Sequence, residues 1–265
     1  MFVELLRRGL AAQLRSGLIW GGALLALTLS VLGVWPSLSS NGGLDAITAG
    51  LSPELVSALG LEDFGSPVGY LNGNLFAMLL PLLIGALAIM QMNALTAADE
   101  DAGRLELLLA LPVSRTAVYL ARFIAVAVVL TLISAAIGLT IVLSAPALDM
   151  ELDAGGVTAV TVAVLLLGLL HAALAFALAG LGVRSPAVLG IAFGVLVLGY
   201  LVHALLPLVP DVADWAAASP WGWALAEVPL ANGLDATGAW LLGGCALALV
   251  GIGLLAVRRR SIRSA

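Results

Sequence analysis

The sequence predicts an all-α, polytopic membrane protein with six transmembrane helices, an N-terminal amphipathic helix and both termini in the cytoplasm. Of its 265 residues, 62% are hydrophobic and only 10% are charged, whereas a soluble domain is about half apolar and about a quarter charged. The mean hydropathy is +1.14. Several apolar runs reach the length of roughly 20 residues that a spanning helix needs, and the charged residues are segregated along the chain.

The residues before the first apolar run have an amphipathic pattern. Glu4, Arg7, Arg8 and Arg15 share one arc of a helical wheel, and apolar side chains fill the other arc. A helix of this kind lies flat on the inner leaflet. An ordinary charged leader is the alternative, because Gly9 weakens the helix. A cleaved signal peptide is disfavoured, since no small-x-small cleavage site follows the run.

Six apolar runs follow one another, each bounded by charge, proline or glycine clusters. They cover residues 17–35, 72–96, 117–145, 157–183, 187–209 and 238–257. Pro81 predicts a kink in the second run, because proline removes a helical hydrogen bond. The fifth run contains Gly190 and Gly194, a small-x-x-x-small pattern that lets two helices approach closely.

The basic residues fix the expected orientation. All 11 of them are arginine, and an N-terminus in the cytoplasm places every one on the cytoplasmic side, as the positive-inside rule requires. They are Arg7, Arg8, Arg15, Arg104, Arg115, Arg122, Arg184, Arg258, Arg259, Arg260 and Arg263. The opposite connections carry acidic residues and no basic residue.

Several chemistries are excluded by composition. The sequence has no lysine, so it can build neither a Walker A phosphate loop nor a Schiff base, and we expect no ATP hydrolysis by this chain and no cofactor bound to it. Cys245 is the single cysteine and has no disulfide partner. No catalytic triad, metal-ligand spacing or basic groove for nucleic acid is present.

The connection over residues 97–115 mixes charge with apolar residues. Three acidic residues, Asp99 to Asp101, suit a helix N-terminus. Leu105 to Leu111 then form a helix-prone run that Pro112 ends, and Ser114 is placed to cap the next helix. A run of seven residues cannot span a membrane, yet it is too apolar for a solvated loop. It therefore packs either against another protein or against the inner ends of the bundle.

The segment from Glu100 to Arg115, E-x-x-G-x-L-E-L-L-L-A-L-P-V-S-R, resembles the first cytoplasmic loop of ABC-2-type ABC transporter permeases. Residues 219–223 (SPWGW), residues 229–235 (PLANGLD) and the final arginine cluster are similar to that family's closing pattern. With six spans and an amphipathic leader, the resemblance covers nearly the whole chain as a single domain, residues 1–265.

The resemblance implies a partner and a set of contact residues. In that family, the leader (residues 1–16 here) is an elbow helix, and the loop at 97–115 contains the coupling helix that docks on a separate ATPase subunit, which uses ATP and Mg²⁺. Carried over by position, the contact candidates are Asp99, Glu100, Asp101, Gly103, Arg104, Leu105, Glu106, Pro112 and Arg115. The resemblance also implies pairing with a second permease copy as a homodimer, and an extracytoplasmic segment of short helices over residues 210–237.

Polar residues inside the apolar runs are candidates for a substrate pathway. His171 lies midway along the fourth run, and Asn93 lies near the inner end of the second. For His171, a hydrogen bond across the bundle is the simpler interpretation. Gln91 and Asn93 also suit the role of polar contacts between helices. His203, near the outer end of the fifth run, is a weaker candidate.

The expected function is that of the permease subunit of an ATP-driven ABC exporter in a bacterial cytoplasmic membrane, moving a hydrophobic or amphipathic substrate outward. Two alternatives stay open. One is a stand-alone polytopic protein, either an ion-coupled carrier or a scaffold, although a carrier usually needs carboxylates within the bilayer. The other is an ABC subunit that moves an extracytoplasmic partner and no solute.

Overall fold

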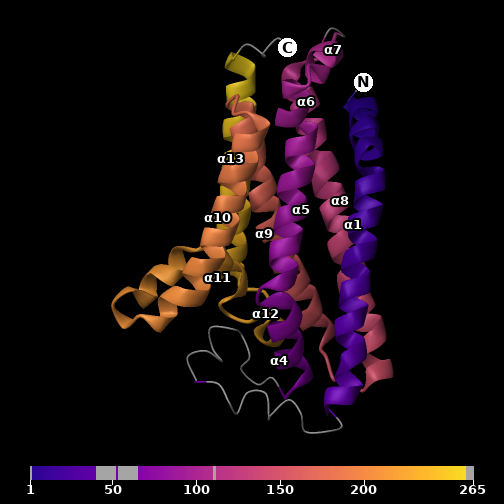
Figure 1. The fold of residues 1–265 in the computed structure, drawn as a ribbon, viewed down its shortest axis with the longest axis vertical. Helices are drawn as coiled ribbons and strands as arrows, with labels where there is room; N and C mark the ends of the chain where they lie inside the picture. Colours follow the sequence, from indigo (N-terminus) through magenta and orange to yellow (C-terminus); the bar gives the residue numbers. More distant parts are fainter. Residues whose placement is uncertain (1, 40–51, 53–64, 110–111, 261–265) are drawn as a thin grey trace.

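A computed structural model describes residues 2–39, 52, 65–109 and 112–260. This part of the chain is helical and contains no strand. It includes six helical stretches long and apolar enough to cross a membrane, which confirms the predicted polytopic all-α fold (Figure 1). Their bounds are Phe2–Ser39, Pro67–Asp101, Arg115–Leu148, Ala154–Gly180, Ser185–Leu208 and Ala236–Arg259. The protein is therefore a multi-pass membrane protein.

Six helices form the bundle, and shorter ones connect them. The long helices are α1 (Phe2–Ser39), α5 (Leu79–Leu95), α8 (Arg115–Ser144), α9 (Ala154–Gly180), α10 (Ser185–Leu205) and α13 (Ala236–Arg259). The short α-helices are α4 (Pro67–Leu71), α6 (Ala97–Asp101), α7 (Arg104–Leu109), α11 (Pro220–Leu225) and α12 (Pro229–Asn232). The other turns are the π-helix η1 (Asn72–Phe76) and the 3₁₀ helices η2 (Ala145–Leu148), η3 (Leu206–Leu208) and η4 (Pro210–Ala218).

The leader is helical and is continuous with the first span. Residues 2–16 belong to α1, which continues without a break to Ser39. Helix α1 runs along α8 (Figure 1), and Gly9 and Gly17 let the two helices approach closely. A Cβ atom on Gly9 would lie 3.1 Å from the Cβ of Ala125, and one on Gly17 would lie 3.2 Å from Val129. The leader therefore packs against α8 together with the rest of α1.

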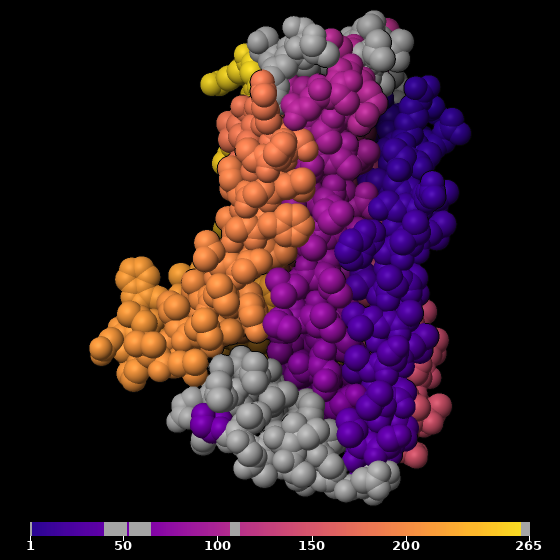
Figure 2. All heavy atoms as spheres, in the orientation of Figure 1, coloured from indigo at the N-terminus to yellow at the C-terminus, as the bar shows by residue number. Residues whose placement is uncertain are grey.

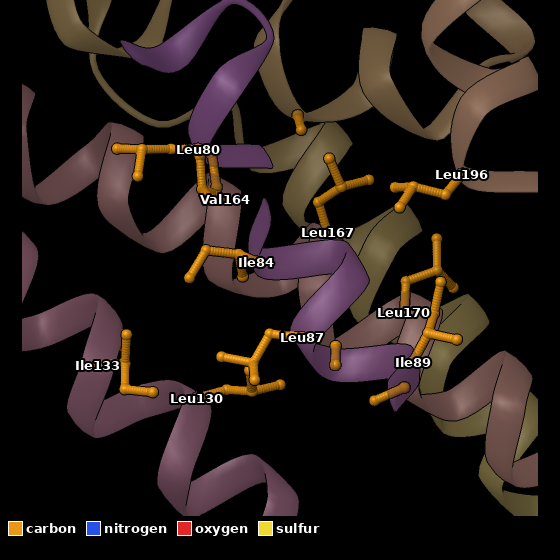
Figure 3. Packing of buried hydrophobic residues seen from close by; sticks show 14 of the residues in the cluster. Leu80, Ile84, Leu87, Ile89, Leu130, Ile133, Val164, Leu167, Leu170 and Leu196 are labelled. Carbon is orange, nitrogen blue, oxygen red and sulfur yellow. The ribbon is translucent and has the colours of Figure 1, made fainter. Parts of the chain in front are cut away.

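The centre of the bundle consists of α5 and α9. These two helices are the most buried of the six spans, and α9 contacts α5, α8, α10 and α13. Leu87 of α5, Leu130 of α8 and Leu167 of α9 are fully buried in this layer (Figure 3). In contrast, α1, α10 and α13 lie at the periphery and expose many apolar side chains, as lipid-facing helices do.

The second span is interrupted near the predicted kink. The π-helix η1 ends at Phe76, and α5 begins at Leu79 after a break at Ala77 and Met78. Pro81 follows directly, and its missing N–H cannot bond the carbonyl of Ala77 one turn earlier. The break thus falls where proline leaves the helix one hydrogen bond short.

The end of the bundle opposite α6 and α7 carries the predicted short helices. Over residues 210–232 the chain forms η4, α11 and α12, and the η4–α11 region stands out from the side of the bundle (Figure 2). Trp221 anchors this region, because its fully buried indole donates a hydrogen bond to the Leu196 carbonyl at 3.1 Å.

Candidate functional site

The loop between the second and third spans folds as two short helices at the end of the bundle where α1 begins (Figure 1). Helix α6 places Asp99 and Glu100 in its first turn. Gly103 separates α6 from α7 with a φ of +71°, a left-handed conformation that glycine adopts without steric cost. The hydroxyl of Ser114 accepts a hydrogen bond from the Ala117 N–H at 3.2 Å, which confirms that Ser114 caps α8.

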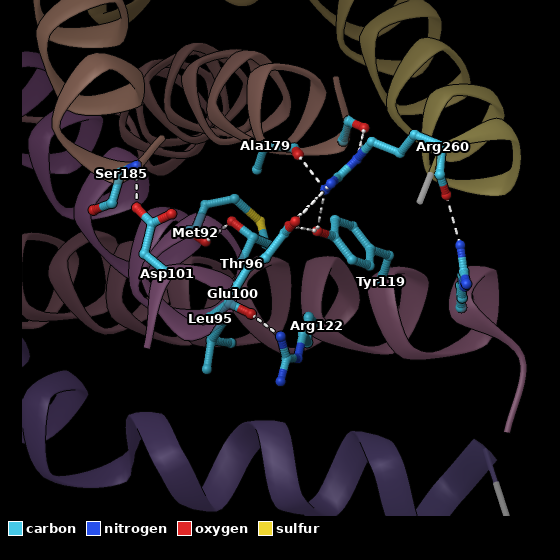
Figure 4. Close-up of polar contacts among 12 residues, drawn as sticks. Met92, Leu95, Thr96, Glu100, Asp101, Tyr119, Arg122, Ala179, Ser185 and Arg260 are labelled. Carbon is cyan, nitrogen blue, oxygen red and sulfur yellow. Dashed lines mark hydrogen bonds and ion pairs between the residues drawn. The ribbon is translucent and has the colours of Figure 1, made fainter. Parts of the chain in front are cut away.

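Glu100 is the centre of a polar cluster at this loop (Figure 4). Its side chain is 0% exposed, and it accepts two hydrogen bonds from the guanidinium of Arg260, at 2.6 and 2.5 Å. The hydroxyl of Tyr119 donates to the same carboxylate at 3.4 Å. Two parallel bonds between arginine and a carboxylate are both strong and geometrically specific. The pair therefore joins α6 to the end of α13, across 160 residues of sequence.

The Arg260 guanidinium also donates hydrogen bonds to the end of α9. Its Nε donates to the Gly180 carbonyl at 2.8 Å, and a terminal nitrogen donates to Ala179 at 3.0 Å. These carbonyls belong to the last turn of α9, where a cation is favourable. Gly182, with a φ of +88°, turns the chain there. The hydrogen bonds to Glu100 raise the pKa of Arg260 above its ordinary value, so the guanidinium stays charged.

Asp99 links α6 to α8 and α7. One carboxylate oxygen accepts a hydrogen bond from Arg122 at 2.7 Å, and the other accepts one from Arg104 at 2.7 Å. Arg122 is itself buried, and it also donates to the Leu95 carbonyl at the end of α5. A buried guanidinium requires such partners because an unpaired charge is costly to bury. Asp99 and Leu95 supply them.

The start of α10 is held by Asp101 of α6 and Asn93 of α5. Asp101 accepts a hydrogen bond from the Ser185 backbone N–H at 2.8 Å. The Asn93 amide donates to the Ser185 hydroxyl at 2.8 Å. Arg184, at the N-cap position of α10, makes no side-chain cap, so Asp101 supplies from α6 the negative charge that a helix N-terminus favours.

We call Asp99, Glu100, Asp101, Tyr119, Arg122 and Arg260 the α6 clasp. Together, these residues connect the loop to α8, to the end of α9, to the start of α10 and to the end of α13.

The predicted contact residues divide between the inside and the outside of the bundle. Glu100 and Leu105 are buried, with Leu105 fully enclosed, so Glu100 contacts the bundle where a contact with a partner was expected. Asp99 and Gly103 are half-buried. The exposed candidates are Asp101, Arg104, Glu106, Pro112 and Arg115. Asp101 and Arg115 still contact the bundle through Ser185 and the Arg260 carbonyl.

His171 and Asn93 lie apart. His171 is buried in α9, and one ring nitrogen shares a hydrogen bond with the Leu167 carbonyl of the same helix at 2.8 Å. Asn93 lies at the α10 contact described above, and its side-chain oxygen is buried without a hydrogen-bond partner. Gln91 joins α5 to α1 through Ser16 at 3.1 Å, which fits the expected polar contact between helices. His203 lines a cavity at the opposite end.

Sequence reasoning missed three members of the clasp: Tyr119, Arg122 and Arg260. Both arginines were read only as orientation signals, and Tyr119 as part of an apolar run. One signal was available, because Arg122 stands inside an otherwise apolar stretch and a buried arginine needs a counter-charge. Among the described residues, no group of three or more histidine, cysteine or acidic side chains could hold a metal ion.

The fold and the α6 clasp define a class of protein. It is a polytopic helical membrane protein in which the loop between the second and third spans is connected through the clasp to α8, α9, α10 and α13. The family described as "Multidrug efflux system permease Rv1217c, C-terminal domain" matches residues 69–258, which is well over half of the chain. The chain therefore belongs to this family of efflux permeases and is a transport permease. No curated protein matches it.

Proposed function

We propose that this chain is the membrane subunit of an ATP-driven efflux system of the ABC-2 type, in a bacterial cytoplasmic membrane. Two copies pair, and each docks a separate ATPase subunit on the loop at residues 97–115. The chain supplies the path for an amphipathic substrate, and the partner hydrolyses ATP. The permease family and the sequence of the loop both support this assignment.

The α6 clasp is the observation that carries the proposal. A partner can change the state of the bundle only if its movement reaches the spanning helices, since coupling needs an element whose arrangement both sites affect. A flexible loop would absorb that movement. Here Glu100 is bonded to Arg260, and Asp101 is bonded to the start of α10. A displacement of α6 must therefore move the ends of α9, α10 and α13 or break these bonds.

The exposed side of the loop is available for the ATPase subunit. Arg104, Glu106 and Pro112 are exposed. The three acidic residues of α6 bond the loop to the rest of the bundle. Both charge signs occur on this surface, so its contacts with a partner are of mixed charge.

Native mass spectrometry tests the docking. The complex is extracted gently from its native membrane, with a Glu106→Arg variant alongside. The matched control is Arg259→Glu, an exposed charge at the same end of the bundle but outside the loop. We expect an assembly of two permeases and two ATPase subunits that survives the control substitution and is lost in the loop variant. A wild-type chain that emerges without an ATPase, under conditions that preserve other transporter complexes, contradicts the proposal.

A further inference from the structure

A cavity lies at the end of the bundle opposite the clasp. It is lined by residues of α4, η1, η3, η4, α10, α11, α12 and the first turns of α13, and its volume is about 940 Å³. Ligand pockets for drug-sized molecules occupy about 300 to 1,000 Å³. The walls are mainly apolar and aromatic, with Tyr200, His203 and Trp223 among the lining residues.

The aromatic walls are held in fixed orientations. The Trp223 indole donates a hydrogen bond to the Ala217 carbonyl at 2.8 Å. The ring of Tyr200 packs on Trp221 with centroids 5.1 Å apart, and the Trp221 indole is bonded to the Leu196 carbonyl. Pre-organised aromatic surfaces lose little entropy when a ligand binds. The cavity is thus a formed site.

The charged residues that line the cavity are all acidic. Among the described lining residues, Glu227 and Asp235 carry carboxylates and none is an arginine. Asp235 is already engaged, because it accepts hydrogen bonds from the Thr237 and Gly238 N–H groups at the start of α13. The Glu227 side chain is exposed, and its backbone carbonyl is held by the Asn232 amide at 2.8 Å. Glu227 thus lines the same cavity as Tyr200 and Trp223.

We propose that this cavity binds an amphipathic organic cation. The aromatic faces of Tyr200 and Trp223 attract a cation through their quadrupoles, and Glu227 supplies the counter-charge. The apolar walls take the hydrophobic part of the molecule, while an anionic amphiphile is repelled. The inference rests on the proposed function, since it names the substrate class of the efflux pathway and places a binding site at the end far from the ATPase.

Equilibrium dialysis of the full chain in phosphatidylcholine nanodiscs tests the inference. The probes are tetraphenylphosphonium and tetraphenylborate, two ions of nearly equal shape and opposite charge, with empty nanodiscs as the blank. We expect saturable binding of the cation only. Glu227→Gln is expected to weaken cation binding about fivefold, the upper range for an exposed charge pair. Trp223→Leu is expected to weaken cation binding by about the same factor. The matched control is Glu151→Gln, an exposed acid outside the cavity.

A variant with the opposite charge at position 227 distinguishes a change in the binding site from a loss of folding. Glu227→Lys is expected to bind tetraphenylborate in preference to tetraphenylphosphonium, which a misfolded protein could not do. Three results would overturn the inference. The wild type could bind the two ions equally, it could fail to bind the cation, or Glu227→Gln and Glu151→Gln could have equal effects. The dialysis contains neither ATP nor a partner subunit, so its results do not depend on the proposed ATPase partner. If that partner does not exist, we still expect the chain to bind the cation.

Discussion

At the scale of single residues, Glu100 and Arg260 depend on each other. The glutamate is fully enclosed, and the exposed fraction of the arginine side chain is 17%. Moving a carboxylate out of water is costly, and the attraction of its partner roughly offsets this cost. The net contribution of such a pair to stability is therefore small, whereas the loss of one member leaves an uncompensated charge. This asymmetry predicts how substitutions behave.

Glu100→Gln keeps the size of the side chain and removes its charge, so Arg260 loses its counter-ion. We expect the free energy of unfolding to fall by about 2 kcal/mol, below the range for a fully buried pair because Arg260 is partly solvated. Arg260→Gln is expected to cost more, about 3 kcal/mol, because it leaves the enclosed carboxylate unpaired. Thermal unfolding in detergent measures both.

The control for this pair is Glu106→Gln, an exposed acid of α7, which is expected to change stability by less than about 0.5 kcal/mol. The double variant Glu100→Gln/Arg260→Gln should cost less than the sum of the single changes, since each removes the partner that the other needs. Strict additivity would show that the two residues do not interact.

The sequence could not predict this pairing. The acidic residues of the loop were recognised, but whether they face a partner or the bundle depends on contacts 160 residues away in sequence. By contrast, the cap at Ser114 was predictable, because its partner is the N–H of Ala117 three residues further on. A hydrogen bond between residues close in sequence can be recognised from a local sequence pattern. For a long-range hydrogen bond, the sequence shows only a charged residue that needs a partner.

At the scale of elements, α9 and α13 approach each other through two glycines near the clasp. A Cβ atom on Gly180 would lie 2.6 Å from the Gly253 carbonyl oxygen, and one on Gly253 would lie 2.7 Å from the ring of Phe176. The close crossing brings Arg260 within reach of the carbonyls of α9. Any side chain at this crossing must push the two helices apart.

Gly253→Ala is therefore expected to lower the free energy of unfolding by about 2 kcal/mol, the usual cost of overpacking. The matched control is Gly251→Ala in the same helix, where a Cβ meets nothing within 4 Å. That substitution should be neutral or raise stability by up to about 1 kcal/mol, because alanine favours helices. Unfolding in detergent distinguishes them, and equal effects would contradict the close crossing.

The positions of the spans were predictable for a simple reason. The length of an apolar run decides whether a helix can cross a membrane, and no partner enters that argument. The form of the leader was not predictable in the same way. Its amphipathic pattern suits a surface helix, but Gly9 and Gly17 pack it against α8, and this contact is invisible until the neighbouring helix is known.

At the scale of the whole molecule, the arginines predict the orientation in the membrane. In a Cys245→Ser background, Glu106→Cys places a thiol at the clasp end, and Ala231→Cys places one at the cavity end; both positions are exposed. We expect a membrane-impermeant maleimide to label the Ala231 variant in intact spheroplasts and the Glu106 variant only after permeabilisation. We expect this labelling because arginine-rich ends of membrane helices lie in the cytoplasm. The reverse labelling pattern would show that the protein has the opposite orientation.

We propose that ATP-driven movement reaches the spanning helices through the α6 clasp. The test reconstitutes the permease with its ATPase in proteoliposomes and measures efflux per ATP hydrolysed, below the unfolding temperature, for Glu100→Gln and for Arg259→Gln, an exposed control outside the loop. A coupling loss of 1 to 2 kcal/mol corresponds to a fall of about five- to thirtyfold. We expect a fall in this range for Glu100→Gln with the complex still assembled and ATP still hydrolysed, and no change for the control. Efflux per ATP that is equal in the two variants would contradict it.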